Sequence, residues 1–443
     1  MTAQYGALVT CGMLALSLRI ATGTWVHPST LFAGAWALFL AVTTLFESVM
    51  IPSPVTAWLI VGTILAVSVG AYSAIRTNEV APASVLSSRW LARFVWAGSA
   101  SAVLSALVTQ RANSISTLGS LSVESVGLAA RQMTALRYES ALTTPAISII
   151  LLAISYGAAL AAPFAAASQL GIHRAALMSA PAVGNALYAA LTTARAAFLI
   201  AVAITIGSWV VVCAVTAGGR PHFSWRTLFF SALATSFVVF VFLWGIVTRY
   251  GGFSGISSIP FARIVGVYMG GSIPAFETWL HDTGSPQFGT QTFAGIAQFL
   301  FQDRSIGSTY RDFASIGDGV STNVYTALRQ LTEDFTLPGM FVALTVFSSI
   351  AAFGYRTAMT RKSVVGAVIA SAWGAFVLFS QIISIFSFTN VTVGLIVGGI
   401  VICRFTEFEP IDDISSAEIH PSLVGDIKRS RTFSSRLAIA ARD

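Results

Sequence analysis

Long, uniformly apolar segments dominate this sequence and leave the chain few folds to adopt. Of its 443 residues, 55% are apolar and 10% are charged, and the mean hydropathy is +0.77. In lipid, only helices and closed barrels satisfy every backbone polar group. Because the segments do not alternate between apolar and polar residues, they predict helices and exclude an outer-membrane barrel. The predicted fold class is an all-α polytopic membrane protein.

The number and orientation of the helices follow from span length and charge. A helix of roughly 17–25 apolar residues crosses a bilayer, which predicts about eleven transmembrane helices. The segments are Tyr5–Leu18, Thr30–Val49, Thr56–Ile75, Leu91–Val108, Ala146–Ala166, Ala176–Thr192, Ala196–Thr216, Thr227–Val247, Gly339–Tyr355, Val364–Ile383 and Thr389–Cys403. Lys and Arg gather in every second connection and in the tail, and this bias assigns those parts to the cytoplasm. The amino terminus is then outside and the tail inside.

One long polar segment, Arg249–Thr336, interrupts the apolar chain. A mere connection needs about 2–8 residues, so a segment of this length is expected to have a function. It contains aromatic residues at intervals and is predicted to be folded and to face outward. The chain is thus divided into an N-terminal transmembrane bundle (1–248), this loop (249–336), C-terminal transmembrane helices (337–404) and a disordered cytoplasmic tail (405–443).

Two helices are predicted inside the long loop. Gln291–Phe301 puts Phe293, Ile296, Ala297 and Leu300 on one helical face, and this apolar stripe is expected to lie on the membrane surface or on the bundle. A second helix is expected to begin after Ser321-Thr322, which are good N-cap residues, and to run through Arg329. Pro338 suits the first turn of the next span, where its missing N–H costs little.

Outward-facing arginines are the best candidates for binding. Arg195 lies in the turn between two apolar spans, where its charge has two explanations. It can snorkel to the headgroups, or its guanidinium can hold the phosphate of a lipid-linked substrate through paired hydrogen bonds. Arg329 is predicted to share a helix face with Tyr325, one turn earlier.

Candidates for a general base are few. His281 is an outward-facing histidine, and Glu277 lies four residues before it, so on a helix one side chain could orient the other. A lone histidine is more often structural. No nucleotide-binding loop, metal-ligand cluster or nucleophile elbow is found in the sequence, so no cofactor, metal or soluble nucleotide donor is expected. The net charge of +7 is explained by the cytoplasmic bias and attraction to anionic lipid, not by nucleic-acid binding.

Several motifs resemble a known family. They are Tyr268-Met-Gly-Gly-Ser-Ile-Pro-Ala-Phe276, Gly289-x-x-Thr292-Phe293, Thr322-Asn323-Val-Tyr325-Thr-Ala-Leu-Arg329, Asp334-Phe335 followed by Gly339, His27-Pro28-Ser29 and the turn at Arg195. Together they resemble the O-antigen and exopolysaccharide repeat-unit polymerases of the Wzy type. The chain departs from the family at one position, because the family often shows Asp-Phe-Gly where this chain has Asp334-Phe335-Thr336.

The resemblance implies a bacterial inner-membrane glycosyltransferase of the GT-C type that works on the periplasmic side without metal or nucleotide. Donor and acceptor would both be glycans on undecaprenyl pyrophosphate, and a chain-length regulator protein is an implied partner. Fixed cations should then meet the charge that develops on the leaving pyrophosphate. The proposed roles are phosphate binding for Arg195, Arg329 and Arg263, base chemistry for His281, Glu277 or Asp334, and sugar contacts for Tyr268, Phe276, Asn323 and Tyr325.

Three other functions remain open at the level of sequence. An O-antigen ligase shares the long outward loop and the arginine chemistry but transfers glycan to the lipid A core. A lipid-linked oligosaccharide flippase or other transporter has no need of a folded outer loop and should line a cavity with polar residues. A scaffold protein of polysaccharide assembly gives no reason for Arg195.

Overall fold

The computed structural model describes residues 2–45, 52–72, 84–87, 89–115, 123–138, 142–169, 171–217, 266–267, 269–280, 285–301, 313–317 and 321–410. The α-helices in these ranges are α1 (Thr2–Thr22), α2 (Pro28–Leu45), α3 (Pro54–Ala71), α4 (Arg89–Ala112), α5 (Val123–Tyr138), α6 (Ala146–Ala167), α7 (Gly171–Thr192), α8 (Arg195–Thr216), α12 (Ser272–Leu280), α13 (Ala294–Phe301), α14 (Ala327–Arg361), α15 (Val364–Phe379) and α16 (Thr389–Phe405). Seven of these helices are long and apolar enough to cross a membrane, and α2, α15 and α16 are shorter apolar helices. The predicted all-α polytopic membrane fold is confirmed. Each predicted span coincides with one of these helices except Thr227–Val247, which lies outside the described residues.

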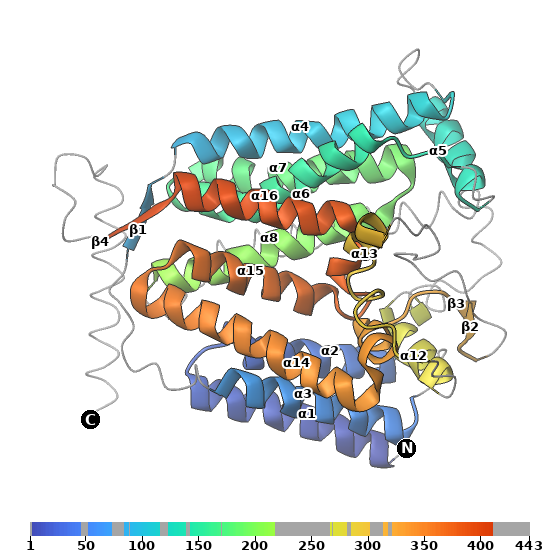
Figure 1. Ribbon diagram of the computed structural model, residues 1–443, viewed down its shortest axis with the longest axis vertical. Coiled ribbons are helices and arrows are strands. Elements are labelled where there is room, and N and C mark those ends of the chain that lie inside the picture. The colour runs from blue at the N-terminus through green and yellow to red at the C-terminus, as the bar shows by residue number, and fades with distance from the viewer. Residues whose placement is uncertain are drawn as a thin grey trace.

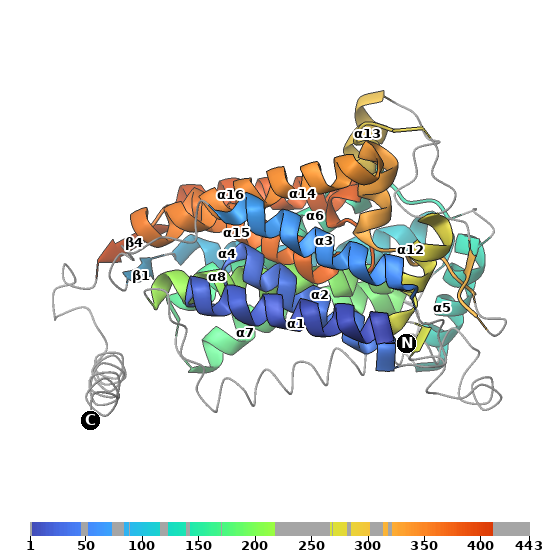
Figure 2. The same cartoon turned by 90° about the horizontal axis from the view of Figure 1, so that it is seen from below.

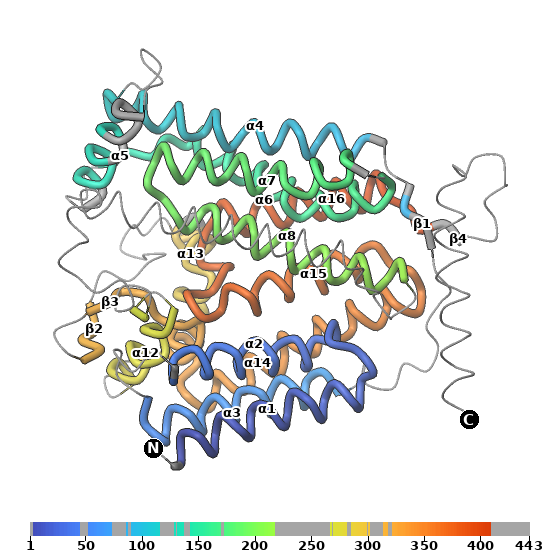
Figure 3. The backbone as a smooth tube through the Cα atoms, turned by 180° about the vertical axis from the view of Figure 1, so that it is seen from behind, coloured from blue at the N-terminus to red at the C-terminus, as the bar shows by residue number. Residues whose placement is uncertain are grey.

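The long helices run back and forth between two ends of the molecule (Figures 1 and 3). At one end, here called the loop end, lie α5, α12, α13 and the short strands β2 (Ala314–Ser315) and β3 (Ser321–Thr322). At the opposite end, the ribbon end, β1 (Ser84–Ser87) pairs antiparallel with β4 (Glu407–Pro410). The first residues of the predicted disordered tail are therefore ordered in β4, while residues 411–443 lie outside the described part.

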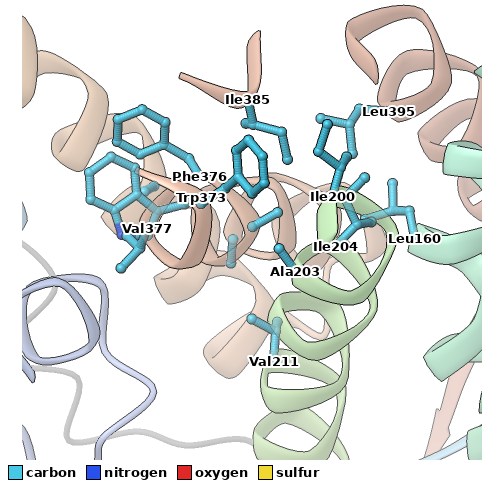
Figure 4. Packing of buried hydrophobic residues seen from close by; sticks show 14 of the residues in the cluster. Leu160, Ile200, Ala203, Ile204, Val211, Trp373, Phe376, Val377, Ile385 and Leu395 are labelled. Carbon is cyan, nitrogen blue, oxygen red and sulfur yellow. The ribbon is translucent and has the colours of Figure 1, made fainter. Parts of the chain in front are cut away.

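Helices from both ends of the sequence share one hydrophobic core. α3 packs on α14, α6 on α16, and α8 on α15, so residues 1–248 and 337–404 contribute jointly to it. Figure 4 shows the centre of this core, where Ile200 and Ile204 of α8 lie close to Leu160 of α6, and Trp373 and Phe376 extend from α15. The loop end is therefore mounted on a single bundle.

Close helix contacts in this bundle depend on glycine. Lipid tails are as apolar as the side chains, so helix association in a membrane relies on close backbone approach at small residues. On α16, Gly394 and Gly398 lie one turn apart against Gly157 of α6. A Cβ atom at Gly398 would lie 2.7 Å from both Cα and O of Gly157, where no side chain fits. α8 and α15 meet in the same way at Gly207 and Gly374.

Substitution Gly398→Ala should therefore separate α6 from α16 and lower stability by about 1–3 kcal/mol, the usual cost of overpacking. The apparent melting temperature of the purified protein in detergent measures the loss. Gly12→Ala in α1 is the matched control, because a Cβ there would have no neighbour within 4 Å. Equal melting temperatures for the two variants would contradict this account of the interface.

Helix α14 begins later than predicted and contains a break. Ser321-Thr322 forms β3, residues 323–325 belong to no helix or strand, and the helix starts at Ala327 after its extended N-cap residue Thr326. At Thr336 the backbone has φ 65° and ψ 172°, a conformation that is essentially restricted to glycine. This break separates a short helix within the loop segment from the membrane span. Pro338 then falls in the first turn of that span, as predicted.

Thr336→Gly should relieve the strain at the break. Removal of the backbone strain should stabilise the folded state by about 1–3 kcal/mol. Glycine gives the unfolded chain more conformational entropy, which lowers stability by about 0.4–1 kcal/mol. Because the Thr336 side chain is exposed, little contact is lost. The expected result is a higher melting temperature. Thr336→Ala is the control, since alanine keeps the Cβ and should give no comparable gain. If alanine stabilises as much as glycine, the backbone at residue 336 is not the cause.

Candidate functional site

A small folded unit forms the loop end beside the bundle. Ala275 of α12, Ala314, Ile316 and Tyr325 are buried together, and the Thr278 hydroxyl donates to the carbonyl of Ser315 at 3.3 Å. These contacts bring α12, the β2–β3 pair and the start of α14 into one cluster, although they are separated by up to 50 residues of sequence. The prediction that this segment is folded agrees with the described residues.

Arg329 is the charged centre of this unit. Its guanidinium carbon lies 4.0 Å from the ring centre of Tyr325 and 5.0 Å from that of Trp279. Its Nε donates to Glu333 Oε1 at 2.9 Å, and the arginine is 4% exposed. A cation held over two aromatic rings and beside a carboxylate is strongly stabilised in place. Tyr325 was predicted to share a helix face with Arg329, but it lies before the N-cap Thr326 and meets the guanidinium from outside the helix. Trp279 and Glu333 were not anticipated.

Asp334 is buried and fully engaged with the backbone. Its carboxylate accepts hydrogen bonds from the N–H groups of Gln291 at 2.9 Å and Thr292 at 2.6 Å, just before α13. In return, the carbonyls of Glu333 and Asp334, released by the break in α14, accept from the N–H groups of Gln287 and Phe288 at 3.0 Å. Since both carboxylate oxygens bind backbone donors in a buried position, Asp334 positions the loop and is a poor general base.

The polar side chains of Gln330 and Ser384 also bind the segment before α13. Gln330 donates to the carbonyl of Gln291 at 3.0 Å and accepts from the N–H of Ser384 at 2.7 Å. The Ser384 hydroxyl donates to the carbonyl of Thr292 at 3.2 Å. The loop segment is thus bonded both to α14 and to the turn after α15. Sequence reasoning missed Gln330, because an amide in an amphipathic helix carries no signal of its long-range partners.

Glu277 also has a structural partner. It lies on α12, and its Oε2 accepts from the N–H of Ser53 at 2.7 Å. Ser53 is the N-cap of α3, so the carboxylate lies at the positive end of that helix and joins α12 to the bundle. The predicted pairing of Glu277 with His281 is not tested, because His281 lies outside the described residues. Tyr268 and Arg263 also lie outside them.

Arg195 lies at the same end of the bundle as α12 and α13 (Figure 1). It is the first residue of α8, follows the N-cap Ala194, and is half-buried with Nη1 shielded from solvent. The preceding residue, Thr193, has a positive φ of 58° and accepts a hydrogen bond from Thr134 of α5 at 3.3 Å. A guanidinium and the N-terminus of a helix are both positive, so together they favour an anion at this position.

Two more residues that were predicted to contact sugars, Asn323 and Phe276, lie in the described part of the chain. Asn323 is exposed in the connection between β3 and α14, and Phe276 is buried against Trp279 with ring centres 6.2 Å apart. Phe276 is therefore a packing residue in this structure. Among the described residues, no group of three His, Cys, Asp or Glu side chains is arranged to hold a metal ion.

Comparison of the chain with protein-family models, with characterised proteins and with solved structures found no match.

A buried histidine lies at the ribbon end. His27, between α1 and α2, is 1% exposed, shares a 2.8 Å hydrogen bond between Nδ1 and the Ser29 hydroxyl, and lies edge-on to Tyr355 with ring centres 5.5 Å apart. Burial lowers the pKa of His27 from 6.5 to about 4. The neutral ring is therefore part of the packed connection, on the side of the bundle away from Arg195.

Acid should destabilise the protein through His27. Between pH 6.5 and 4 the unfolded state binds a proton that the folded state excludes, so stability is lost as pH falls through this window, by up to a value on the order of 3 kcal/mol. Melting temperatures measured from pH 7 to pH 4 should fall steeply in the native protein and less in His27→Gln. His173→Gln, which changes an exposed histidine, should retain the native pH dependence. If the melting temperature of His27→Gln depends on pH as steeply as that of the native protein, His27 is not the cause of this dependence.

Proposed function

We propose that this chain is a membrane-embedded glycosyltransferase that polymerises lipid-linked oligosaccharide repeat units on the outer face of a bacterial inner membrane. Its donor and acceptor are glycans on undecaprenyl pyrophosphate. The observation that carries the proposal is Arg195, a permanent cation at the N-terminus of α8, at the same end of the bundle as the folded unit that holds a second arginine, Arg329. A pyrophosphate that leaves a sugar needs fixed positive charge at the membrane surface.

Charge distribution supports the orientation. More of the described cations lie at the ribbon end, near the ends of the spans, than at the loop end. The ribbon end has Arg19, Arg93, Arg174, Arg361, Lys362 and Arg404, and the loop end has Arg111, Arg131, Arg195 and Arg329. The positive-inside rule assigns such an end to the cytoplasm. The loop end, with Arg195 and Arg329, then faces outward, where lipid-linked glycans await transfer.

The two arginines support different roles in this reaction. Arg195, half-buried at a helix N-terminus, suits direct contact with the pyrophosphate oxygens. Arg329 is buried between Tyr325, Trp279 and Glu333, so it suits the positioning of the loop unit above the bundle. The sequence-based hypothesis of a phosphate contact at Arg329 is therefore replaced by a positioning role.

In the proposed transfer, the acceptor hydroxyl attacks the anomeric carbon of the donor sugar and loses its proton to a base. The bond between that carbon and the pyrophosphate oxygen breaks, and undecaprenyl pyrophosphate leaves with the electron pair. Because the carboxylates of Asp334 and Glu277 are bound to backbone N–H groups, His281 is the remaining proposed base.

Buried hydroxyls within the bundle weigh against a transport pathway. Ser101 of α4 donates to the carbonyl of Leu151 at 2.8 Å, and Ser105 and Ser148 are hydrogen-bonded to one another at 2.7 Å. These groups join α4 to α6 in the manner of interhelical hydrogen bonds in membrane proteins. They are used in helix packing and do not line a route for a polar substrate.

Cells that lack the chain should display single repeat units on their lipid A core, as seen on a polysaccharide gel. An absence of any repeat unit on the core would instead indicate a ligase or a flippase, and intact long chains would exclude the polymerase and the ligase. This experiment tests the reaction class.

Arg195→Gln should reduce polymer formation by about 10²–10³-fold, the usual loss for one donor to a developing charge. Arg195→Lys, which keeps charge but not the paired geometry, should be intermediate. The control is Arg111→Gln, an exposed arginine on α4 at the same end, which should leave polymer length and amount unchanged. Native polymer from Arg195→Gln at normal protein level would reject the assigned role.

A further inference from the structure

Helix α13 has two different apolar sides. On the inner side, Ala294 and Ala297 are buried, and Gly295 lies so close to Thr389 at the start of α16 that a Cβ atom would meet its backbone. Phe293, just before the helix, stacks on Phe386 with ring centres 5.9 Å apart. This side is the attachment of α13 to the bundle. The predicted stripe is thus divided, because Phe293 and Ala297 face the protein while Leu300 does not.

The outer side is apolar and exposed. Leu300 is 66% exposed, Phe301 is 67% exposed, and Phe288 in the preceding turn is 83% exposed. The helix sequence Ala294–Phe301 contains no charged residue. Exposure of these three side chains to water would be unfavourable, by about 25 cal/mol for each Å² of apolar surface.

Phe288 is also held in an unfavourable backbone conformation. Its φ is 48°, which is uncommon for a bulky residue, and the neighbouring Gly289 has φ 91°. The hydrogen bond from the Phe288 N–H to the Asp334 carbonyl at 3.0 Å contributes to keeping it there. The backbone of Phe288 is therefore strained while its aromatic side chain faces outward. Strained residues of this kind are frequent at functional positions.

The position of α13 identifies what covers this side. Figure 2 shows α13 projecting beyond the layer formed by α14 and α16, at the loop end of the bundle. Both helices expose large apolar residues along their length: Val342, Val346, Ile350 and Phe353 on α14, and Val393, Ile396 and Ile400 on α16. In a membrane-spanning bundle those residues contact lipid tails. The exposed side of α13 continues this lipid-facing surface at its boundary.

We propose that Phe288, Leu300 and Phe301 insert into the interfacial layer of the lipid bilayer and anchor the loop end to the membrane surface. A short helix with one apolar side is the type of element that lies in this layer, with its apolar residues at the boundary between headgroups and acyl chains. The partner is the bilayer itself, and the proposal stands whether or not the chain is a glycosyltransferase.

This anchor is connected to the arginine unit. The backbone of Gln291 and Thr292 bonds to Asp334 and Gln330, which lie on the short helix of α14 that also contains Arg329. The depth at which α13 rests in the bilayer therefore determines the height of Arg329 above the membrane. In the proposed function, this sets the distance between the folded loop and a lipid-linked substrate.

Site-specific fluorescence tests the proposal in the full chain. Cys11, Cys213 and Cys403 are first replaced by alanine, and Leu300→Cys is then labelled with an environment-sensitive fluorophore in phospholipid nanodiscs. Lipids that carry a nitroxide quencher near the headgroup should quench this label about threefold more than a label on Ser315→Cys, because only the former lies at interfacial depth. Aqueous iodide should give the opposite order. Ser315 is exposed on β2 at the same end and is the matched control.

A third label, at Ile350→Cys on α14, should respond to quenchers deep in the acyl chains and fixes the depth scale. Equal access of iodide to the labels at Leu300 and Ser315 would overturn the proposal. Shielding of the Leu300 label from both iodide and lipid quenchers would also overturn it, since a protein partner would then cover α13. Phe301→Cys provides a second reading at the same surface if Leu300→Cys lowers the melting temperature.

Discussion

The loop end depends on hydrogen bonds exchanged between the break in α14 and residues 287–292. A helix that ends inside a protein leaves carbonyl groups without partners. Here the carbonyls of Glu333 and Asp334 accept from residues 287 and 288, while the Asp334 carboxylate accepts from residues 291 and 292. The strained backbone of Thr336 ends the first helix and creates these acceptors. This exchange joins the helix of Arg329 to the segment that leads into α13, while Gly295 and Phe293 attach α13 to the bundle itself.

The bundle beneath is rigid for a different reason. Its helices approach one another at glycines such as Gly157 and Gly398, and buried hydroxyls bond across helices to carbonyl groups. Backbone contact of this kind leaves no freedom for one helix to slide past another without loss of many contacts. A rigid bundle with a bonded loop unit suits a fixed site at the membrane surface, because charge stabilisation works best when the cations do not have to move.

Sequence reasoning predicted the features that arise from local chemistry. Spans follow from apolar length, and Pro338 indicated the start of the last long span. The direction of the spans, assigned from Arg and Lys, stays a prediction. The spacing of Tyr325 and Arg329 correctly suggested that they are neighbours, although Tyr325 lies before the helix and not on its face. Sequence reasoning did not predict the roles of Asp334 and Glu277. The N–H groups that Asp334 binds are about 40 residues away in sequence, and the one that Glu277 binds is more than 200 residues away. Such partners carry no sequence signal, so a buried structural carboxylate resembles a catalytic one.

The sequence by itself determined that this chain crosses a membrane many times and keeps a long polar segment at one end, since bilayer thickness and backbone hydrogen bonding permit little else. Tertiary structure alone decided which polar residues are already engaged and which remain candidates for chemistry. It also decided that Leu300 and Phe301 face outward while Phe293 and Ala297 face the bundle. Helical periodicity groups Phe293, Ala297 and Leu300 on one stripe, and only the docking of α13 on α16 divides that stripe into a buried and an exposed part.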